Sequence, residues 1–175
     1  MRISKYLLII IIFIMTSCHK DDDSVAPIDQ LPPATQTGAG TFGCLVNGEA
    51  FIDNSGSFNC FYQLVSGEYY FGLSGAKEDY FIRQIFLASN NKSIEEGNTY
   101  LLMANIEGSV YAECSFQGVG VSADTGETMI GELHITTFNF ETYIVSGTFW
   151  FDLKDPISGE TVKIREGRFD SHFTQ

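Results

Sequence analysis

From Thr41 onward the chain alternates apolar and polar residues in short runs, which are separated by residues that favour turns. Alternation with a period of two places the apolar side chains on one face of a β-strand, whereas an α-helix requires a period of 3.6. No window of 12 or more residues carries a helical apolar stripe. Asn47-Gly48 is the strongest hairpin signal, because a type I′ turn needs two residues at positive φ. The pattern therefore predicts an all-β domain built of hairpins.

Short turns also predict which residues face each other across each hairpin. Two-residue turns are predicted at Asn47-Gly48 and Ser66-Gly67, and a three-residue turn at 140–142. A shift of one residue would turn every apolar side chain to the wrong face, so the apolar pattern fixes the register. The predicted pairs are Leu45 with Ala50, Cys44 with Phe51, Leu64 with Tyr69, Tyr62 with Phe71, Cys60 with Leu73, Leu133 with Phe149, and Ile135 with Gly147.

Further strands are expected at 81–88, 99–105, 109–116 and 143–153, with a closing strand around Val162 and Ile164. The total is about nine or ten antiparallel strands, mostly connected by hairpins and each with one apolar face. These faces must be buried against one another. An antiparallel β-sandwich or flattened barrel is the predicted fold, and a calycin-like up-and-down barrel with an internal cavity is the alternative.

The N-terminus has a different composition. Arg2 and Lys5 precede an unbroken apolar run of ten residues, Tyr6 to Met15. A membrane-spanning helix needs about 20 such residues, so this run fits the apolar part of a signal peptide instead. Ser17 followed by Cys18 resembles the lipobox of bacterial lipoproteins, although Met15 stands where Leu is more usual. That resemblance implies cleavage after residue 17 and lipidation of Cys18 with fatty acyl chains such as palmitate, and two or more chains give stable membrane anchoring.

Residues 18–40 are predicted to be the lipidated cysteine and a flexible tether, and residues 41–175 the folded domain. Lys20 followed by Asp21, Asp22 and Asp23 resembles the surface-export signal of Bacteroidota lipoproteins. It implies an outer-membrane location facing the cell exterior, with the periplasmic face as the alternative. Asp23-Ser24-Val25 resembles an O-glycosylation sequon of the same phylum, which makes Ser24 a candidate for modification.

A wider resemblance covers both ends of the predicted domain. The segments 31–48, 145–149 and 166–170 look like an uncharacterised family of Bacteroidota lipoproteins. This resemblance implies the compartment and an all-β fold. It transfers no functional residues, because that family has no assigned activity.

Charge and motifs restrict the function classes. From Thr41 onward there are 18 acidic and seven basic residues, a net charge of −11, which disfavours nucleic acid as a partner. The sequence predicts no catalytic residues, no cofactor and no metal: no nucleophile elbow, dinucleotide-binding context or clustered metal ligands occur. His134 is predicted to point outward, opposite Thr148.

Cysteines and aromatic residues supply the remaining candidates. Three cysteines remain if Cys18 is lipidated, and either all three are buried thiols or one pair, Cys44–Cys60, forms a disulfide. Trp150, Tyr70 and Tyr111 alternate away from the apolar faces of their strands, with Trp150 beside Glu132. Such aromatic side chains can contact a sugar or a protein partner, or they can stiffen the sheet.

Three functions are consistent with these features. The first is a non-enzymatic, membrane-anchored module at the cell surface that binds a glycan or an outer-membrane protein, or serves as its accessory subunit. The second is a small-molecule carrier with an internal cavity. The third is a hydrolase with dispersed acidic residues, which would need two carboxylates roughly 5–9 Å apart across a cleft.

Overall fold

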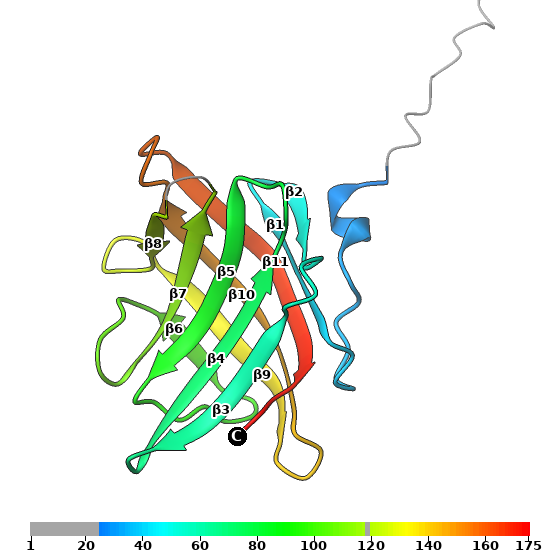
Figure 1. Ribbon diagram of the computed structural model, residues 1–175, viewed down its shortest axis with the longest axis vertical. Helices are drawn as coiled ribbons and strands as arrows, with labels where there is room; N and C mark the ends of the chain where they lie inside the picture. Colours follow the sequence, from blue (N-terminus) through cyan, green and yellow to red (C-terminus); the bar gives the residue numbers. More distant parts are fainter. Residues whose placement is uncertain (1–24, 118–119) are drawn as a thin grey trace, which may run out of the picture.

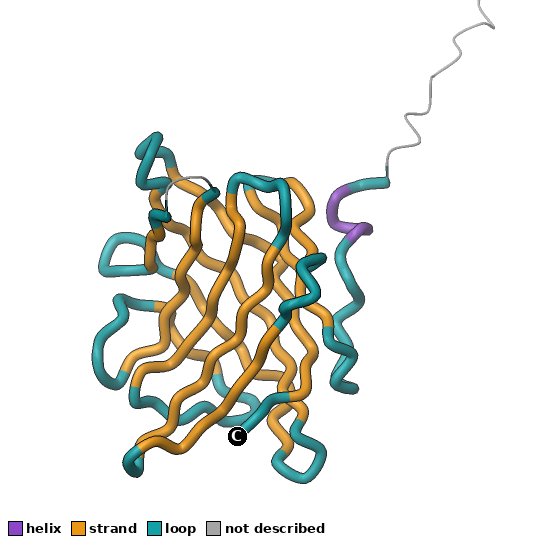
Figure 2. Tube along the Cα trace, viewed as in Figure 1, coloured by secondary structure: helices purple, strands orange, loops and turns teal. Residues whose placement is uncertain are grey.

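A computed structural model describes residues 25–117 and 120–175. These residues form one short 3-10 helix and eleven strands, drawn in Figures 1 and 2. In chain order the elements are η1 (Pro27–Gln30), β1 (Thr41–Val46), β2 (Glu49–Ile52), β3 (Asn59–Val65), β4 (Glu68–Ala76), β5 (Ile82–Asn90), β6 (Thr99–Leu102), β7 (Ser109–Phe116), β8 (Ser122–Asp124), β9 (Gly131–Asn139), β10 (Ile144–Lys154) and β11 (Thr161–His172).

The strands form one curled sheet in the order β2-β1-β11-β10-β9-β6-β7-β5-β4-β3, with β8 paired to β7. The sheet curls into a half-barrel, so that strands from its two ends approach each other (Figure 1). Beyond β11 the chain crosses to β3, where Tyr62 N donates to Thr174 O at 2.8 Å and Thr174 N donates to Cys60 O at 3.1 Å. The C-terminal residues therefore link β11, the third strand from one end of the sheet, to β3 at the other end.

The predicted all-β architecture is confirmed, and so are the predicted cross-strand pairs. The predicted three-residue turn at 140–142 is wrong, because Asn139 pairs with Ile144 across four residues, and a bulge at Thr136 restores the predicted register. The turns at Asn47-Gly48 and Ser66-Gly67 have positive φ at both residues, as their hairpins require. Every predicted cross-strand pair occurs in the β1–β2, β3–β4 and β9–β10 ladders. Leu64 and Tyr69 are paired as expected, yet they are 59% and 38% exposed because the end of this hairpin projects beyond the core.

The expectation of a wholly antiparallel sheet of nine or ten strands is corrected in two respects. The described residues contain eleven strands, and β6 pairs with β7 in parallel through Leu102 and Val110. The short strand β8 has only three residues, too few to show an alternating pattern.

The inner face of the curled sheet is filled by apolar side chains. Phe42 on β1 stacks on Phe149 of β10, with ring centroids 5.3 Å apart. The same ring occupies the space where a Cβ on Gly75 of β4 would lie. Phe71 on β4 also meets Phe169 on β11, with ring centroids 6.5 Å apart. Side chains from strands far apart in the sheet order thus meet across the interior.

The cysteines contribute to this interior. Cys44, Cys60 and Cys114 are all buried and free in the structure, which agrees with the alternative of three buried thiols and not with a Cys44–Cys60 disulfide. Burial raises the pKa of Cys60 to about 12 and also raises the pKa values of Cys44 and Cys114, which keeps the thiols protonated.

The predicted flexible tether does not extend to residue 40. We call residues 31–40 the strap: they lie along the outer side of β1 and β11 and are held there by hydrogen bonds to Asp170. Leu31 is buried, and Pro32 covers Gly43 of β1. The earlier part of the predicted tether includes η1, which lies against β2.

In residues 25–117 and 120–175, no helix is both long and apolar enough to cross a membrane.

Candidate functional site

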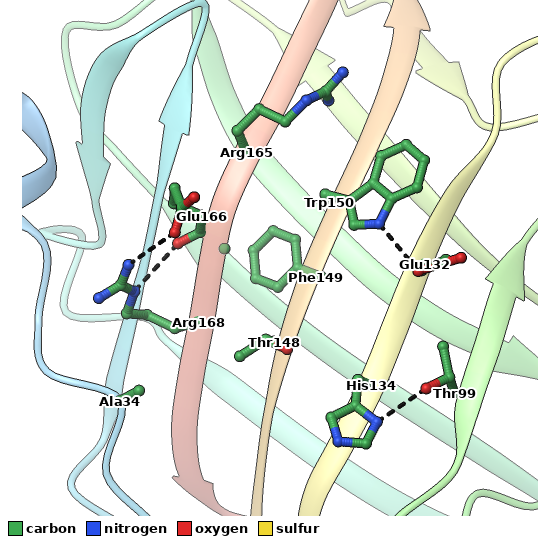
Figure 3. A pocket seen from close by; sticks show the side chains of 11 residues that line it. Ala34, Thr99, Glu132, His134, Thr148, Phe149, Trp150, Arg165, Glu166 and Arg168 are labelled. Atoms are coloured by element: carbon green, nitrogen blue, oxygen red, sulfur yellow. Dashed lines mark hydrogen bonds and ion pairs between the residues drawn. The ribbon is translucent and has the colours of Figure 1, made fainter.

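A depression of about 550 Å³ lies on the outer face of the sheet, across β6, β9, β10 and β11 (Figure 3). Strand alternation explains most of its composition: residues that point away from the apolar interior line it, whereas Phe149 and Gly167 belong to the inner face of the sheet. The lining residues are Ala34, Thr99, Glu132, His134, Thr148, Phe149, Trp150, Arg165, Glu166, Gly167 and Arg168.

Three successive outward residues of β10 define the shape of the depression. Trp150 is large and stands at one side, Thr148 is small and exposed, and Ser146 is buried beneath the strap. Because these side chains are two residues apart, they lie side by side on one face of the strand. The depression is therefore open above Thr148, with the Trp150 side chain on one side and the strap on the other.

The wall on the Trp150 side is a row of three side chains from adjacent strands. Trp150 Nε1 donates to Glu132 Oε2 on β9 at 3.2 Å. The Arg165 guanidinium on β11 lies over the indole, 5.3 Å from the ring centroid, and forms a 2.7 Å ion pair with Asp152. These contacts confirm the predicted position of Trp150 beside Glu132. They also hold the indole in place, so the wall is formed before any ligand arrives.

The opposite wall is the strap, which is fastened by one buried carboxylate. Asp170 on β11 is fully buried and accepts hydrogen bonds from strap residues and from β10. The donors are Thr35 Oγ1 at 2.6 Å, Thr37 N at 2.9 Å, Thr37 Oγ1 at 3.2 Å, Gly38 N at 2.8 Å, Ala39 N at 3.1 Å and Ser146 Oγ at 2.7 Å. Burial alone would raise the pKa of Asp170, but these hydrogen bonds outweigh it and hold the pKa well below its usual range.

The floor of the depression is shaped by a β-bulge in β11. Phe149 pairs with Gly167 and Phe151 pairs with Ile164, so Arg165 and Glu166 together oppose Trp150. Glu166 takes a φ of 54°, which is uncommon for a residue other than glycine. Gly167 has no side chain, and the Phe149 ring fills the space that its Cβ would occupy. That ring is buried in the core on the inner face, so the bulge leaves a shallow floor without a large outward side chain and directs Arg168 towards the depression.

Polar groups surround this floor. His134 Nδ1 lies 3.0 Å from Thr99 Oγ1, and His134 faces Thr148 across the β9–β10 ladder, as predicted. No carboxylate among the described residues hydrogen-bonds to His134, so the Thr99–His134 pair lacks the third group that orients a catalytic histidine. The arrangement offers hydroxyl, imidazole and guanidinium groups for hydrogen bonding, without an activated nucleophile.

The three aromatic residues proposed from the sequence do not form one site. Trp150 lines the depression, whereas Tyr70 lies on β4 opposite Gln63, and Tyr111 lies on β7, where its ring packs edge-on against Phe86 with centroids 6.2 Å apart. Sequence reasoning missed Arg168 and the strap. The bulge at Glu166 breaks the alternation that would have placed Arg168, and the strap has no apolar periodicity.

Several predicted functional residues lie outside the described part of the chain. They are Cys18, Lys20, Asp21, Asp22, Asp23 and Ser24. Where the structure does describe side chains, no three histidine, cysteine or carboxylate groups are close enough together to hold a metal ion. Comparison with protein-family models, curated proteins and solved structures finds no match.

Proposed function

We propose that this protein is a lipid-anchored, surface-displayed module that binds a saccharide in the depression on the outer face of β9, β10 and β11. The observation that carries the proposal is the depression itself. It combines an immobilised indole and several hydrogen-bonding side chains in a space of about 550 Å³, which suits a ligand of roughly one to three sugar rings.

Saccharides suit this arrangement because each ring has apolar C–H faces and a periphery of hydroxyl groups. The edge of the Trp150 indole supplies apolar contact, while Thr148, His134 and Arg168 supply hydrogen-bond partners. The walls are held by contacts within the protein, which reduces the entropy lost when a ligand binds.

The two rival functions have less support. A carrier needs an internal cavity, yet Phe42 and Phe149 fill the interior between β1, β4 and β10. A hydrolase needs two carboxylates across a cleft; Glu132 and Glu166 come from strands two apart, roughly 10 Å between strand axes, and Glu132 is bonded to Trp150. A protein partner is the remaining alternative, and co-purification of the lipidated protein with a stoichiometric outer-membrane protein would support it.

A glycan array probed with the lipidated protein in detergent tests the saccharide proposal. We expect binding to a restricted group of glycans, with the affinity of Trp150→Ala reduced at least about tenfold, because aromatic contacts dominate such sites. Tyr70→Ala is the matched control, because Tyr70 lies on β4 away from the depression. Absence of any glycan binding, or equal binding by Trp150→Ala, would contradict the proposal.

The anchor and the location have separate tests. Labelled palmitate is expected to enter the wild-type chain and not Cys18→Ala. Protease added to intact cells is expected to digest the wild-type protein, and to spare a variant in which Asp21, Asp22 and Asp23 are replaced by Asn. Digestion of both to the same extent would argue that these aspartates do not direct surface export.

A further inference from the structure

The two arginines of the depression differ in how fully their donors are used. Arg165 donates to the backbone oxygens of Phe151 at 3.1 Å and Ile164 at 2.7 Å, and it pairs with Asp152 at 2.7 Å. Arg168 donates only through Nε, to Glu166 O at 3.2 Å, and its Nη2 lies 3.6 Å from the Glu166 carboxylate. A guanidinium has five N–H donors, so most of those of Arg168 remain available to a ligand.

The single acidic partner of Arg168 among the described residues is a weak one. The Glu166 side chain is 59% exposed, whereas the Arg168 side chain is only 21% exposed. An ion pair at 3.6 Å with one exposed member contributes little, because water screens it and the side chain loses entropy to maintain it. A ligand carboxylate could replace Glu166 at little cost and bind the guanidinium with two parallel hydrogen bonds.

The position of Arg168 is fixed by its surroundings. It stands opposite Gly43 in the β1–β11 ladder, and Pro32 of the strap covers Gly43. Figure 3 shows Arg168 and Glu166 on one side of Thr148, and Trp150 and His134 on the other. A ring lying over Thr148 would have its polar substituents directed to both sides.

Charge adds a reason for selectivity. The chain has a net charge of −12, so an anionic ligand is repelled by most of its surface. Two of the four arginines in the whole sequence nevertheless line this one depression. Since Arg165 is neutralised by Asp152, Arg168 is the cation that can attract an anion there.

We infer that the ligand of the depression is an acidic saccharide, an oligosaccharide containing hexuronic acid, whose carboxylate binds Arg168 while its ring lies over Thr148 beside Trp150. This inference rests on the proposed function, because it names the substrate class of the same site. In this arrangement Glu166 competes with the ligand carboxylate for Arg168. In the free protein, the Glu166 carboxylate occupies the place near Arg168 that the ligand carboxylate takes when it binds.

Calorimetric titration of the lipidated protein in detergent tests this inference. The probes are uronic-acid oligosaccharides and their methyl esters, which have the same rings and linkages without the charge. We expect the acid to bind about tenfold more tightly than the ester, as a charge-assisted hydrogen bond would provide. Arg168→Gln should abolish this difference, so that the acid and the ester bind to the variant with equal affinity. Glu166→Gln should strengthen binding of the acid, because it removes the competing carboxylate.

Lys163→Gln is the matched control, because it removes one positive charge from β11 outside the depression and should keep the preference for the acid. Equal binding of acid and ester would overturn this inference and leave the proposed function standing, as would binding of neutral glycans alone. Failure to bind any saccharide would overturn both. Equal competition by short poly-glutamate would show a carboxylate site without sugar recognition, which also overturns it.

Discussion

At the scale of the single residue, Asp170 is the most consequential side chain of the described structure. Its buried carboxylate accepts six hydrogen bonds that join the strap to β10 and β11. We expect Asp170→Asn to lower the free energy of unfolding at pH 7 by about 2–4 kcal/mol, because the amide turns a donor towards groups that are themselves donors. Urea unfolding followed by circular dichroism measures this loss.

The pH dependence of this effect follows from the lowered pKa of Asp170. The stabilisation is present above the pKa of the unfolded carboxyl, about 3.9, and it is lost as the pH falls through the lower pKa of the folded state. The difference between wild type and Asp170→Asn should therefore shrink between pH 7 and pH 3. A constant difference across this range would contradict the role given to the charge. Asp79→Asn, at an exposed turn, is the control.

The buried thiols give a second prediction at this scale. Since Cys44, Cys60 and Cys114 are buried and their pKa values are raised, a thiol reagent at pH 8 should react with none of the three in the folded protein. All three should react after unfolding in urea without a reductant. Fewer than three reactive groups, or a mass two hydrogens lower, would indicate a disulfide.

At the scale of the element, the strap behaves as part of the fold. It contributes a buried leucine, a proline packed on Gly43, and most of the partners of Asp170. A chain that begins at Thr41 should be less stable than one that begins at Val25 by about 3–5 kcal/mol, because it leaves Asp170 without those donors. Urea unfolding of the two chains under the same conditions measures this difference in the free energy of unfolding.

A milder variant covers the case in which the shorter chain does not fold. Thr35→Val removes the 2.6 Å hydrogen bond to Asp170 while keeping the size of the side chain. We expect a loss of about 1–3 kcal/mol and faster proteolysis within residues 31–40. Unchanged stability in Thr35→Val would mean that the strap is held by packing alone.

Elements also show what the sequence could and could not predict. Asn47-Gly48 fixed one hairpin because turn chemistry and alternation agree there, and the same holds for Ser66-Gly67. The parallel β6–β7 contact was not predictable, because nothing local in Leu102 or Val110 encodes it. The packing of the strap against the sheet was not predictable, because its attachment depends on Asp170, more than 130 residues away in the chain. Of the two walls of the depression, the sequence indicated only the one that contains Trp150, because the other wall is the strap.

At the scale of the whole molecule, the strap limits how the domain can sit relative to a lipid anchor. Six residues lie between Cys18 and Val25, so these two residues can be at most about 25 Å apart even when the chain is fully extended. Figure 1 shows η1, in blue, at the end of the half-barrel that carries the β10–β11 turn, in orange. The β3–β4 and β9–β10 turns lie at the opposite end, and β11 alone has 12 residues, roughly 40 Å of strand.

If Cys18 is lipidated as proposed, the β10–β11 turn should therefore lie nearer the membrane than the β9–β10 turn. Spin labels at Ile157→Cys and Glu141→Cys would report this, since the native thiols are buried and should not react. In vesicles containing a nickel-chelating lipid, we expect faster relaxation of the label at 157 than at 141, because collision with the metal declines with distance from the surface. Equal relaxation at both sites would mean that the strap does not orient the domain. Faster relaxation at 141 would place the aromatic hairpin ends, including exposed Phe140 and Tyr143, against the lipid instead.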